Sequence, residues 1–331
     1  MRWMIWMLLA GPVLGLELRL PTDNDALLRG AGPEFFQVVD RLFEGVQSTP
    51  WEGGQFGFVR DAKRLGDRIA YARFHEGLDI RPLQRDARGD PLDEVRAILP
   101  GEVVHVSASP SRSNYGRYVV LRHDLPQGPL YSLYAHLARI SVQNGQRLDA
   151  GSGLGLMGYS GSGINQRRAH VHVELNMLLS PSYANWHQAQ FQSPNHHGIY
   201  NGINLLGLDL QRLYLEAKAN PALDLAQFWR ATEVYFEVEL PRAMTPDFAQ
   251  RHPFLLSGSR DQEAGSWLLR CSRWGLPVEL RAMPALVTSP RVSWTKSDPL
   301  PHGLNSRGLL TNSGLLSREG KRWLDLLLGK P

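Results

Sequence analysis

The seven residues AHVHVEL, at positions 169–175, constrain this chain more than any other stretch. Polar and apolar residues alternate in it with a period of two, which is typical of a β-strand with one buried face. Residues two apart on a strand point to the same side, so His170, His172 and Glu174 should emerge together while the valines and the leucine enter a core. The pattern therefore brings two imidazoles into one small volume.

A second stretch, FHEGLDI at positions 74–80, carries His75 and Asp79 four residues apart. This even spacing predicts that both side chains lie on one face of an extended strand. Imidazole nitrogens and carboxylate oxygens are ligands that zinc prefers. In a chain with 11 histidines neither spacing is specific alone, so the inference depends on the whole set of motifs.

Composition excludes several classes of protein. With 331 residues the chain is long enough for two units with cores of their own. Its 32 glycines, 22 prolines and 21% charged residues fit a turn-rich globular protein. The net charge of +4 favours an acidic surface but is too small to indicate nucleic acid. Cys271 is the single cysteine, so no intramolecular disulfide can form.

The N-terminus resembles a secretory signal peptide over residues 1–15. Arg2 precedes an apolar run from about residue 3 to residue 14, which is too short to span a bilayer unaided. An uncleaved anchor is the alternative interpretation. No cysteine follows the expected cut, which excludes lipidation there. We expect an exported protein without stable membrane insertion after cleavage.

The remaining chain predicts a mainly β fold with an additional α+β region at its C-terminal end. Residues 16–50 form an N-terminal helical segment, with an amphipathic helix expected over residues 33–45. Residues 51–185 contain short strands at close spacing, which favours an antiparallel β domain. The expected strands there are residues 56–59, 68–74, 95–99, 102–106, 118–122 and 131–136.

Residues 200–331 are predicted to form the α+β region, and residues 185–201 before it a loop. Asp224 is expected to cap one of its helices. The other predicted elements are helices over residues 209–218 and 317–328, and strands over residues 234–240, 267–271 and 278–281.

The sequence GLGLMG at positions 153–158 matches the glycine fingerprint of dinucleotide-binding proteins. That site needs a helix directly after the glycines, but YSGSG follows at positions 159–163. We therefore interpret these glycines as turn residues.

Three motifs occur in a characteristic order: HEGLD at 75–79, YAHL at 134–137 and HVH at 170–172, with NGQ at 144–146 and the glycine run between them. This set resembles the lysostaphin-type (LytM-type) zinc metallopeptidases, which cut peptide bridges or stems of peptidoglycan. The resemblance covers about residues 68–178. It implies an antiparallel β domain of the duplicated hybrid motif kind.

The resemblance also implies roles for five residues. His75, Asp79 and His172 would be zinc ligands, and His136 and His170 the unliganded catalytic pair. Three protein ligands leave a fourth position for a water, whose pKa zinc lowers to about 7. That water could attack a peptide carbonyl while one histidine moves the proton and the other stabilises the oxyanion. Which histidine does which is left open.

Two hypotheses concern residues around this set. Glu174 would orient a ligand histidine, with a structural ion pair as the alternative. Arg167 or Arg168 would lie at the mouth of the cleft and bind a carboxylate of a stem peptide, with a solvated turn as the alternative.

Other functions compete with that of a peptidoglycan endopeptidase. A catalytically silent relative would bind the wall or regulate another hydrolase, but it would not keep all five residues. A carboxypeptidase of another zinc fold is a further alternative, and it would need a histidine-to-aspartate spacing other than that of His75 and Asp79. Residues 200–331 could bind glycan, contact a partner or cover the cleft. We expect peptidoglycan as substrate and a periplasmic or extracellular, wall-associated location.

Overall fold

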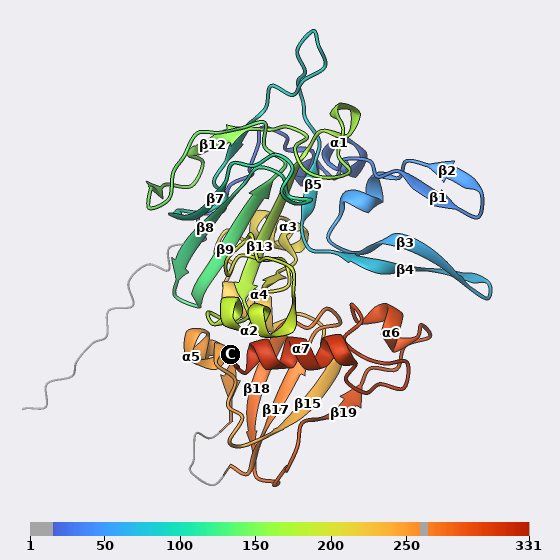
Figure 1. Cartoon of the computed structure of the whole chain (residues 1–331), viewed down its shortest axis with the longest axis vertical. Coiled ribbons are helices and arrows are strands. Elements are labelled where there is room, and N and C mark those ends of the chain that lie inside the picture. The colour runs from blue at the N-terminus through green and yellow to red at the C-terminus, as the bar shows by residue number, and fades with distance from the viewer. Residues whose placement is uncertain (1–15, 259–263, 331) are drawn as a thin grey trace, which may run out of the picture.

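The computed structural model describes residues 16–258 and 264–330, so the predicted signal peptide lies outside it (Figure 1). The chain forms a larger β body, which contains a seven-stranded sheet, and a C-terminal part with a five-stranded sheet. The predicted fold class, mainly β with an α+β C-terminal region, is confirmed. In the described part of the chain, no helix has both the length and the apolar character needed to cross a membrane.

The larger sheet is antiparallel and has the order β11-β7-β8-β9-β13-β14, with β5 paired to β13 as well. The sequence predicted its four longest strands, and missed β14, which has only three residues. The strands are β5 (Leu78–Ile80), β7 (Gly101–Ser107), β8 (Tyr118–Leu125), β9 (Gly128–Ala135), β11 (Arg147–Leu148), β13 (Val171–Leu178) and β14 (Leu205–Gly207).

Three smaller sheets surround this one. Two are hairpins, β1–β2 and β3–β4, which project from the same side of the β body in Figure 1. The third has the order β10-β12-β6 and contains the glycine run, where a Cβ on Gly155 would collide with the carbonyl of Arg139. The strands are β1 (Arg41–Phe43), β2 (Val46–Ser48), β3 (Gly57–Leu65), β4 (Arg68–His75), β6 (Glu94–Arg96), β10 (Arg139–Ile140) and β12 (Gly153–Leu156).

The helix predicted over residues 33–45 is wrong beyond its first turn. Helix α1 spans only Gly32–Phe35; Phe36 is extended, and the rest of the predicted helix lies in the hairpin of β1 and β2 and the residues before it. Phe36 forms a bridge with Ile80 of β5 and is buried. Tertiary pairing with β5 thus overrides the helical periodicity of this segment.

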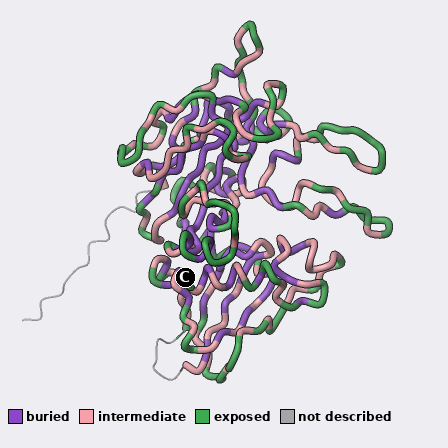
Figure 2. The backbone as a smooth tube through the Cα atoms, viewed as in Figure 1, coloured by how far each residue is buried: buried purple, intermediate pink, exposed green. Residues whose placement is uncertain are grey.

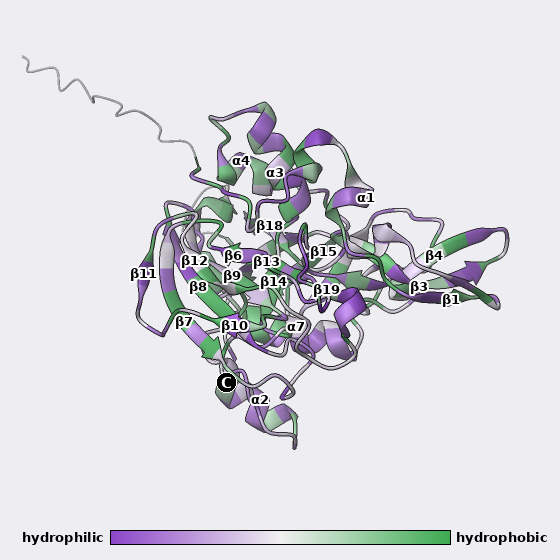
Figure 3. Cartoon of the chain, turned by 90° about the horizontal axis from the view of Figure 1, so that it is seen from above, coloured by the Kyte–Doolittle hydropathy of each residue, from purple (hydrophilic) through white to green (hydrophobic). Residues whose placement is uncertain are grey.

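The apolar core runs through both parts of the molecule, as the buried segments in Figure 2 show. Val171, Val173 and Leu175 of β13 enter it and are fully buried, as predicted. Helices α3 (Leu210–Ala219) and α4 (Leu225–Arg230) contribute to the same core. The view from above shows hydrophobic residues concentrated on central strands such as β8 (Figure 3). Because the core is continuous, the C-terminal part packs directly on the β body.

The C-terminal sheet has the order β16-β18-β17-β15-β19, and helix α7 lies across it (Figure 1). Asp224 caps α4 by accepting a hydrogen bond from the amide of Ala226 at 2.8 Å, which confirms the predicted cap. The elements are β15 (Phe236–Pro241), β16 (Leu256–Ser257), β17 (Ser266–Cys271), β18 (Pro277–Met283), β19 (Arg291–Thr295), α5 (Phe248–Arg251), α6 (His302–Asn305) and α7 (Arg318–Leu327).

Two further corrections concern residues near the predicted boundary between the parts. The predicted loop at residues 185–201 begins inside helix α2 (Tyr183–Gln190), which buries Tyr183 and Trp186 three positions apart. Strand β14 lies in the stretch assigned to the C-terminal region but pairs with β13 of the larger sheet. The domain boundaries themselves stay predictions.

Candidate metal centre

Three strands bring His75, Asp79 and His172 together. His75 ends β4, Asp79 lies in the middle of β5, and His172 lies opposite Asp79 in the antiparallel register of β5 and β13. The two motif residues therefore belong to separate strands, which corrects the single strand predicted for residues 74–80. Gly77 permits this turn, because a Cβ there would lie 2.5 Å from the carbonyl oxygen of Val173.

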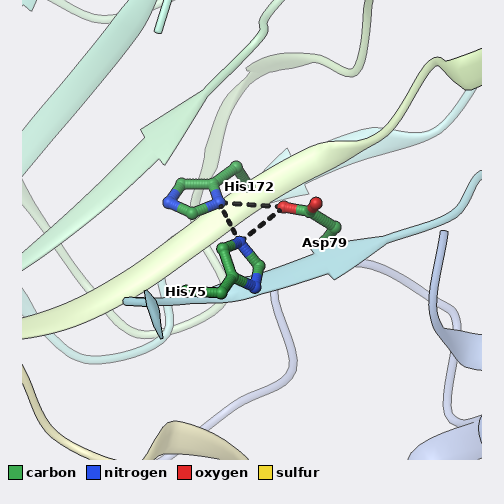
Figure 4. A group of neighbouring side chains, drawn as sticks. All are labelled: His75, Asp79 and His172. Atoms are coloured by element: carbon green, nitrogen blue, oxygen red, sulfur yellow. Dashed lines mark hydrogen bonds and ion pairs between the residues drawn. The ribbon is translucent and has the colours of Figure 1, made fainter. Parts of the chain in front are cut away.

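The three side chains place their ligand atoms at nearly equal separations (Figure 4). His75 Nε2 lies 3.1 Å from His172 Nδ1, and Asp79 Oδ1 lies 3.1 Å from the former and 2.9 Å from the latter. A tetrahedral zinc ion with bonds of about 2.0 Å needs ligand atoms about 3.3 Å apart. The three atoms are thus spaced as one face of such a site.

The hydrogen bonds on the outer side of each imidazole set its tautomer. His75 Nδ1 donates to the carbonyl oxygen of Gln55 at 2.7 Å, and His172 Nε2 donates to Glu174 Oε1 at 2.7 Å. The inward nitrogens consequently present lone pairs to each other and to the carboxylate of Asp79. Only a positive centre among them, either a metal ion or a shared proton, relieves that repulsion. The residues therefore fit a divalent metal.

Both carboxylates of the cluster have further partners. Arg60 of β3 donates to Asp79 Oδ2, on the side away from the histidines. Tyr115 and Asn176 donate to the two oxygens of Glu174 at 3.0 and 2.8 Å. The predicted contact of Glu174 with a ligand histidine is confirmed, and its effect on metal affinity stays a prediction.

The other two predicted histidines lie beside this cluster. His136 Nδ1 donates to the carbonyl oxygen of Ser160 at 2.9 Å, and His170 Nδ1 donates to that of Arg168 at 2.6 Å. Their ring centroids are 4.6 Å apart, and His170 Nε2 lies 3.4 Å from Asp79 Oδ1. Because a carbonyl oxygen can only accept, both rings carry a proton on Nδ1. The fold thus brings together all five residues, while their roles stay predictions.

His136 also adopts a strained backbone conformation. Its φ of 64° lies in the left-handed region, which is uncommon for a residue with a Cβ. Strain of this kind concentrates at functional sites, where surrounding contacts hold it.

Burial and charge shift the pKa values of the cluster in directions that suit a metal site. Burial lowers the pKa of His75 and, aided by the neighbouring imidazoles, lowers that of His136 well below 6.5. Burial opposes ionisation of Asp79, yet His75, His170 and Arg60 together hold its pKa well below the usual range. Although burial works against it, hydrogen bonds to Asp79 and Glu174 raise the pKa of His172 to about 10. The site thus attracts positive charge strongly.

Strand β13, which carries His172, is buried on both faces, and His170 directly before it is buried as well; this corrects the prediction of one exposed face. His170, His172 and Glu174 are only 1, 7 and 2% exposed. They line a cleft of about 1170 Å³ whose walls include the two projecting hairpins. Arg168 lines this cleft, whereas Arg167 bonds to Asp40 at 2.7 Å.

Several contacts of the site have no local signal in the sequence. Arg60, Tyr115 and the carbonyl of Gln55 reach the cluster from segments outside the three motifs. Each contact joins residues at least 19 positions apart, so no spacing within a strand indicates it.

Comparisons with known proteins agree with the motifs. Residues 73–183 match the model of peptidase family M23, and this segment contains all five predicted site residues. A search of the curated proteins finds no match.

Three solved structures illustrate what the chain is similar to. A variant of the catalytic domain of the prophage-encoded M23 protein EnpA from Enterococcus faecalis is 25% identical over 42% of this chain and 79% of its own, with a TM-score of 0.26. The catalytic domain of the antimicrobial peptidase lysostaphin from Staphylococcus simulans is 24% identical over 31% and 66%, with a TM-score of 0.24. A zinc-containing peptidase from Vibrio cholerae is 21% identical over 42% and 43%, with a TM-score of 0.25.

The assignment to a family rests on the matched model and on the motifs within it. The resemblance to lysostaphin-type peptidases is thereby confirmed. Residues 73–183 of this chain belong to peptidase family M23.

Proposed function

We propose that the protein is a zinc-dependent endopeptidase that hydrolyses peptide bonds in peptidoglycan stems or cross-bridges. One observation carries the proposal: three inward-facing ligand atoms, 2.9 to 3.1 Å apart, lie in a cleft beside two more imidazoles, those of His136 and His170. Zinc bound there would supply an activated water and polarise the scissile carbonyl.

The side chains divide the work by their contacts. His75, Asp79 and His172 would hold the ion, and Glu174 would keep the ring of His172 in the tautomer that ligation requires. The low pKa of His136 keeps its imidazole neutral near pH 7, so its Nε2 can accept a proton from the attacking water.

His170 would complete the proton transfer. Its Nε2 lies on the same side of the cluster as Asp79 Oδ1, and its Nδ1–H is held by a backbone carbonyl. The proton that His136 takes from the water would pass to the leaving amine, either directly or through Nε2 of His170. The two histidines can thus act on opposite ends of the same reaction.

We further propose that the protein acts outside the cytoplasm. The apolar run after Arg2 resembles an export signal, and peptidoglycan lies beyond the membrane. The mild positive charge of +4 would favour approach to an acidic wall.

The test is digestion of purified peptidoglycan by the zinc-loaded protein, followed by mass spectrometry of the released fragments. We expect the protein to release peptide fragments, a chelator to abolish this release and added zinc to restore it. His136→Ala should release far less, whereas the control Leu286→Ala, at a side chain that is 87% exposed, should match the wild type. Identical fragments with and without chelator, or none from the zinc-loaded wild type, would refute the proposal.

A further inference from the structure

The sheet face that carries His172 and Glu174 continues onto β9 and β8. Glu174 lies opposite Leu133, which lies opposite Val120 in turn. Leu133 and Val120, together with Tyr118, are completely buried. A peptide lying on this face could not continue past Glu174, because the floor beyond it is already covered.

The cover is a segment of the same chain, residues 195–203, here called the cap segment. Ile199 and Tyr200 pack on the apolar residues of this face, and His197 Nδ1 lies 2.7 Å from the hydroxyl of Tyr118. The rings of Tyr200 and Tyr131 are 5.8 Å apart. The cap segment therefore occupies the place that one arm of an extended substrate would need.

Hydrogen bonds fix the cap segment to the body of the protein. Asn204, which directly follows it, is fully buried and donates to the carbonyls of Ser180 and Ile199 at 2.8 and 2.9 Å. Its side-chain oxygen accepts from the amide of Ser180 at 2.9 Å. The amide of Leu205 donates to the carbonyl of Asn201 at 3.1 Å. The segment is thus a built wall of the cleft.

The wall stands close to the metal ligands. His172 Nε2 is 2.7 Å from Glu174, and Glu174 is 3.0 Å from the hydroxyl of Tyr115. A Cβ on Gly202 would lie 3.0 Å from that hydroxyl, so the cap segment lies directly behind Tyr115. These two hydrogen bonds share Glu174 Oε1, so the hydroxyl of Tyr115 lies at most about 6 Å from His172 Nε2, which is the rise of about two extended residues.

The cleft continues on the opposite side. Its lining there includes Arg41 and Leu42 of β1, Val59 of β3 and Arg73 of β4. These residues belong to the two hairpins that project from the β body (Figure 1). The cleft is therefore closed at one end and extended at the other.

We propose that the cap segment limits the substrate to about two residues on one side of the scissile bond. This inference rests on the proposed function and narrows it: the enzyme would trim peptide stems near an end. It would disfavour cross-bridges, because a cross-bridge continues as a long chain on both sides of the cut.

The experiment uses synthetic peptides built around the bond that fragment mass spectrometry identifies. Each peptide is extended by zero to four glycines at one end or at the other, and kcat/KM is measured with the zinc-loaded full chain. We expect less than a threefold change for extension at one end, and at least a tenfold fall beyond about two residues at the other. Equal tolerance at both ends would overturn the inference. If the enzyme cleaves none of the peptides, the proposed function is overturned, and the inference with it.

A second measurement addresses the cap segment directly. Ile203 lines the cleft and is 45% exposed, so the core does not depend on its side chain. The readout is kcat/KM for the longest peptide divided by that for the unextended one. Ile203→Gly should raise this ratio at least threefold and Ile203→Trp should lower it. The control Leu286→Ala, at a side chain 87% exposed, should leave it unchanged. An unchanged ratio in both Ile203 variants would refute the role of the cap segment.

Discussion

Glu174→Gln should weaken zinc binding while leaving the fold intact. The carboxylate accepts hydrogen bonds from His172, Tyr115 and Asn176 at 2.7, 3.0 and 2.8 Å. The substitution keeps the size of the side chain but removes its charge and replaces one acceptor with a donor. That donor must then face either His172 Nε2 or the amide of Asn176, and both of these are donors.

The magnitude follows from the bond to His172. A hydrogen bond to a charged group contributes about 1.5–3 kcal/mol and a neutral one about 0.5–1.5 kcal/mol, so the change costs about 1–2 kcal/mol. Losing a partner that orients a ligand histidine raises the dissociation constant of the metal by about tenfold to hundredfold. The two estimates overlap, because each 1.4 kcal/mol is about a factor of ten and 1–2 kcal/mol is therefore about fivefold to thirtyfold.

The assay is competition for zinc between the metal-free protein and a chromophoric chelator of known affinity. We expect the dissociation constant to rise by about tenfold to hundredfold in Glu174→Gln. Circular dichroism spectra and thermal unfolding of the variant check that its fold is retained.

Glu76→Gln is the matched control. Glu76 directly follows His75, one of the three proposed ligands, and lines the same cleft, but it pairs with Arg307 at 2.8 Å. Its substitution removes the same charge near the site but leaves the hydrogen bond between Glu174 and His172 in place. Zinc affinity should therefore stay within threefold of the wild type. A wild-type dissociation constant in Glu174→Gln, or equal losses in both variants, would refute the reasoning.

Three further predictions test separate parts of the molecule. His75→Ala should abolish tight zinc binding, whereas His136→Ala should retain the metal and lower kcat by about 10²–10⁴. Metal analysis and kinetics check this, and loss of zinc in His136→Ala would contradict the separation of metal-binding from catalytic histidines. Arg168→Ala should raise KM at least threefold for a stem peptide with a free carboxylate, because Arg168 lines the cleft. Arg167→Ala should not, because Arg167 pairs with Asp40 instead. Equal KM values in both variants would count against a role for Arg168. Burial lowers the pKa of His252 to about 4, below about 6.5 in the unfolded chain, so the unfolded state binds more protons in this range. The free energy of unfolding should therefore fall by up to about 3 kcal/mol as the pH drops from about 6.5 to 4, and denaturant titrations should show a shallower fall in His252→Gln; an identical slope would exclude this histidine as the cause.

Much of the candidate site could be predicted because its residues lie in short strands with a regular pattern. Alternation over residues 169–175 identified β13, and the order of the three motifs identified His75, Asp79, His136, His170 and His172. The convergence of these residues depends on the register of β5 and β13, which the sequence does not show directly.

By itself, the sequence determined the strand periodicity, the capped helix after Asp224 and the residue types available for a metal, because each of these depends on neighbours a few positions apart. Only the tertiary structure decided that Phe36 pairs with Ile80, that Arg60 holds Asp79 and that residues 195–203 cover an apolar face of the sheet. Those features arise from contacts between segments distant in the chain. Such contacts leave no local pattern, and the burial they provide outweighs the preferences of the segments themselves.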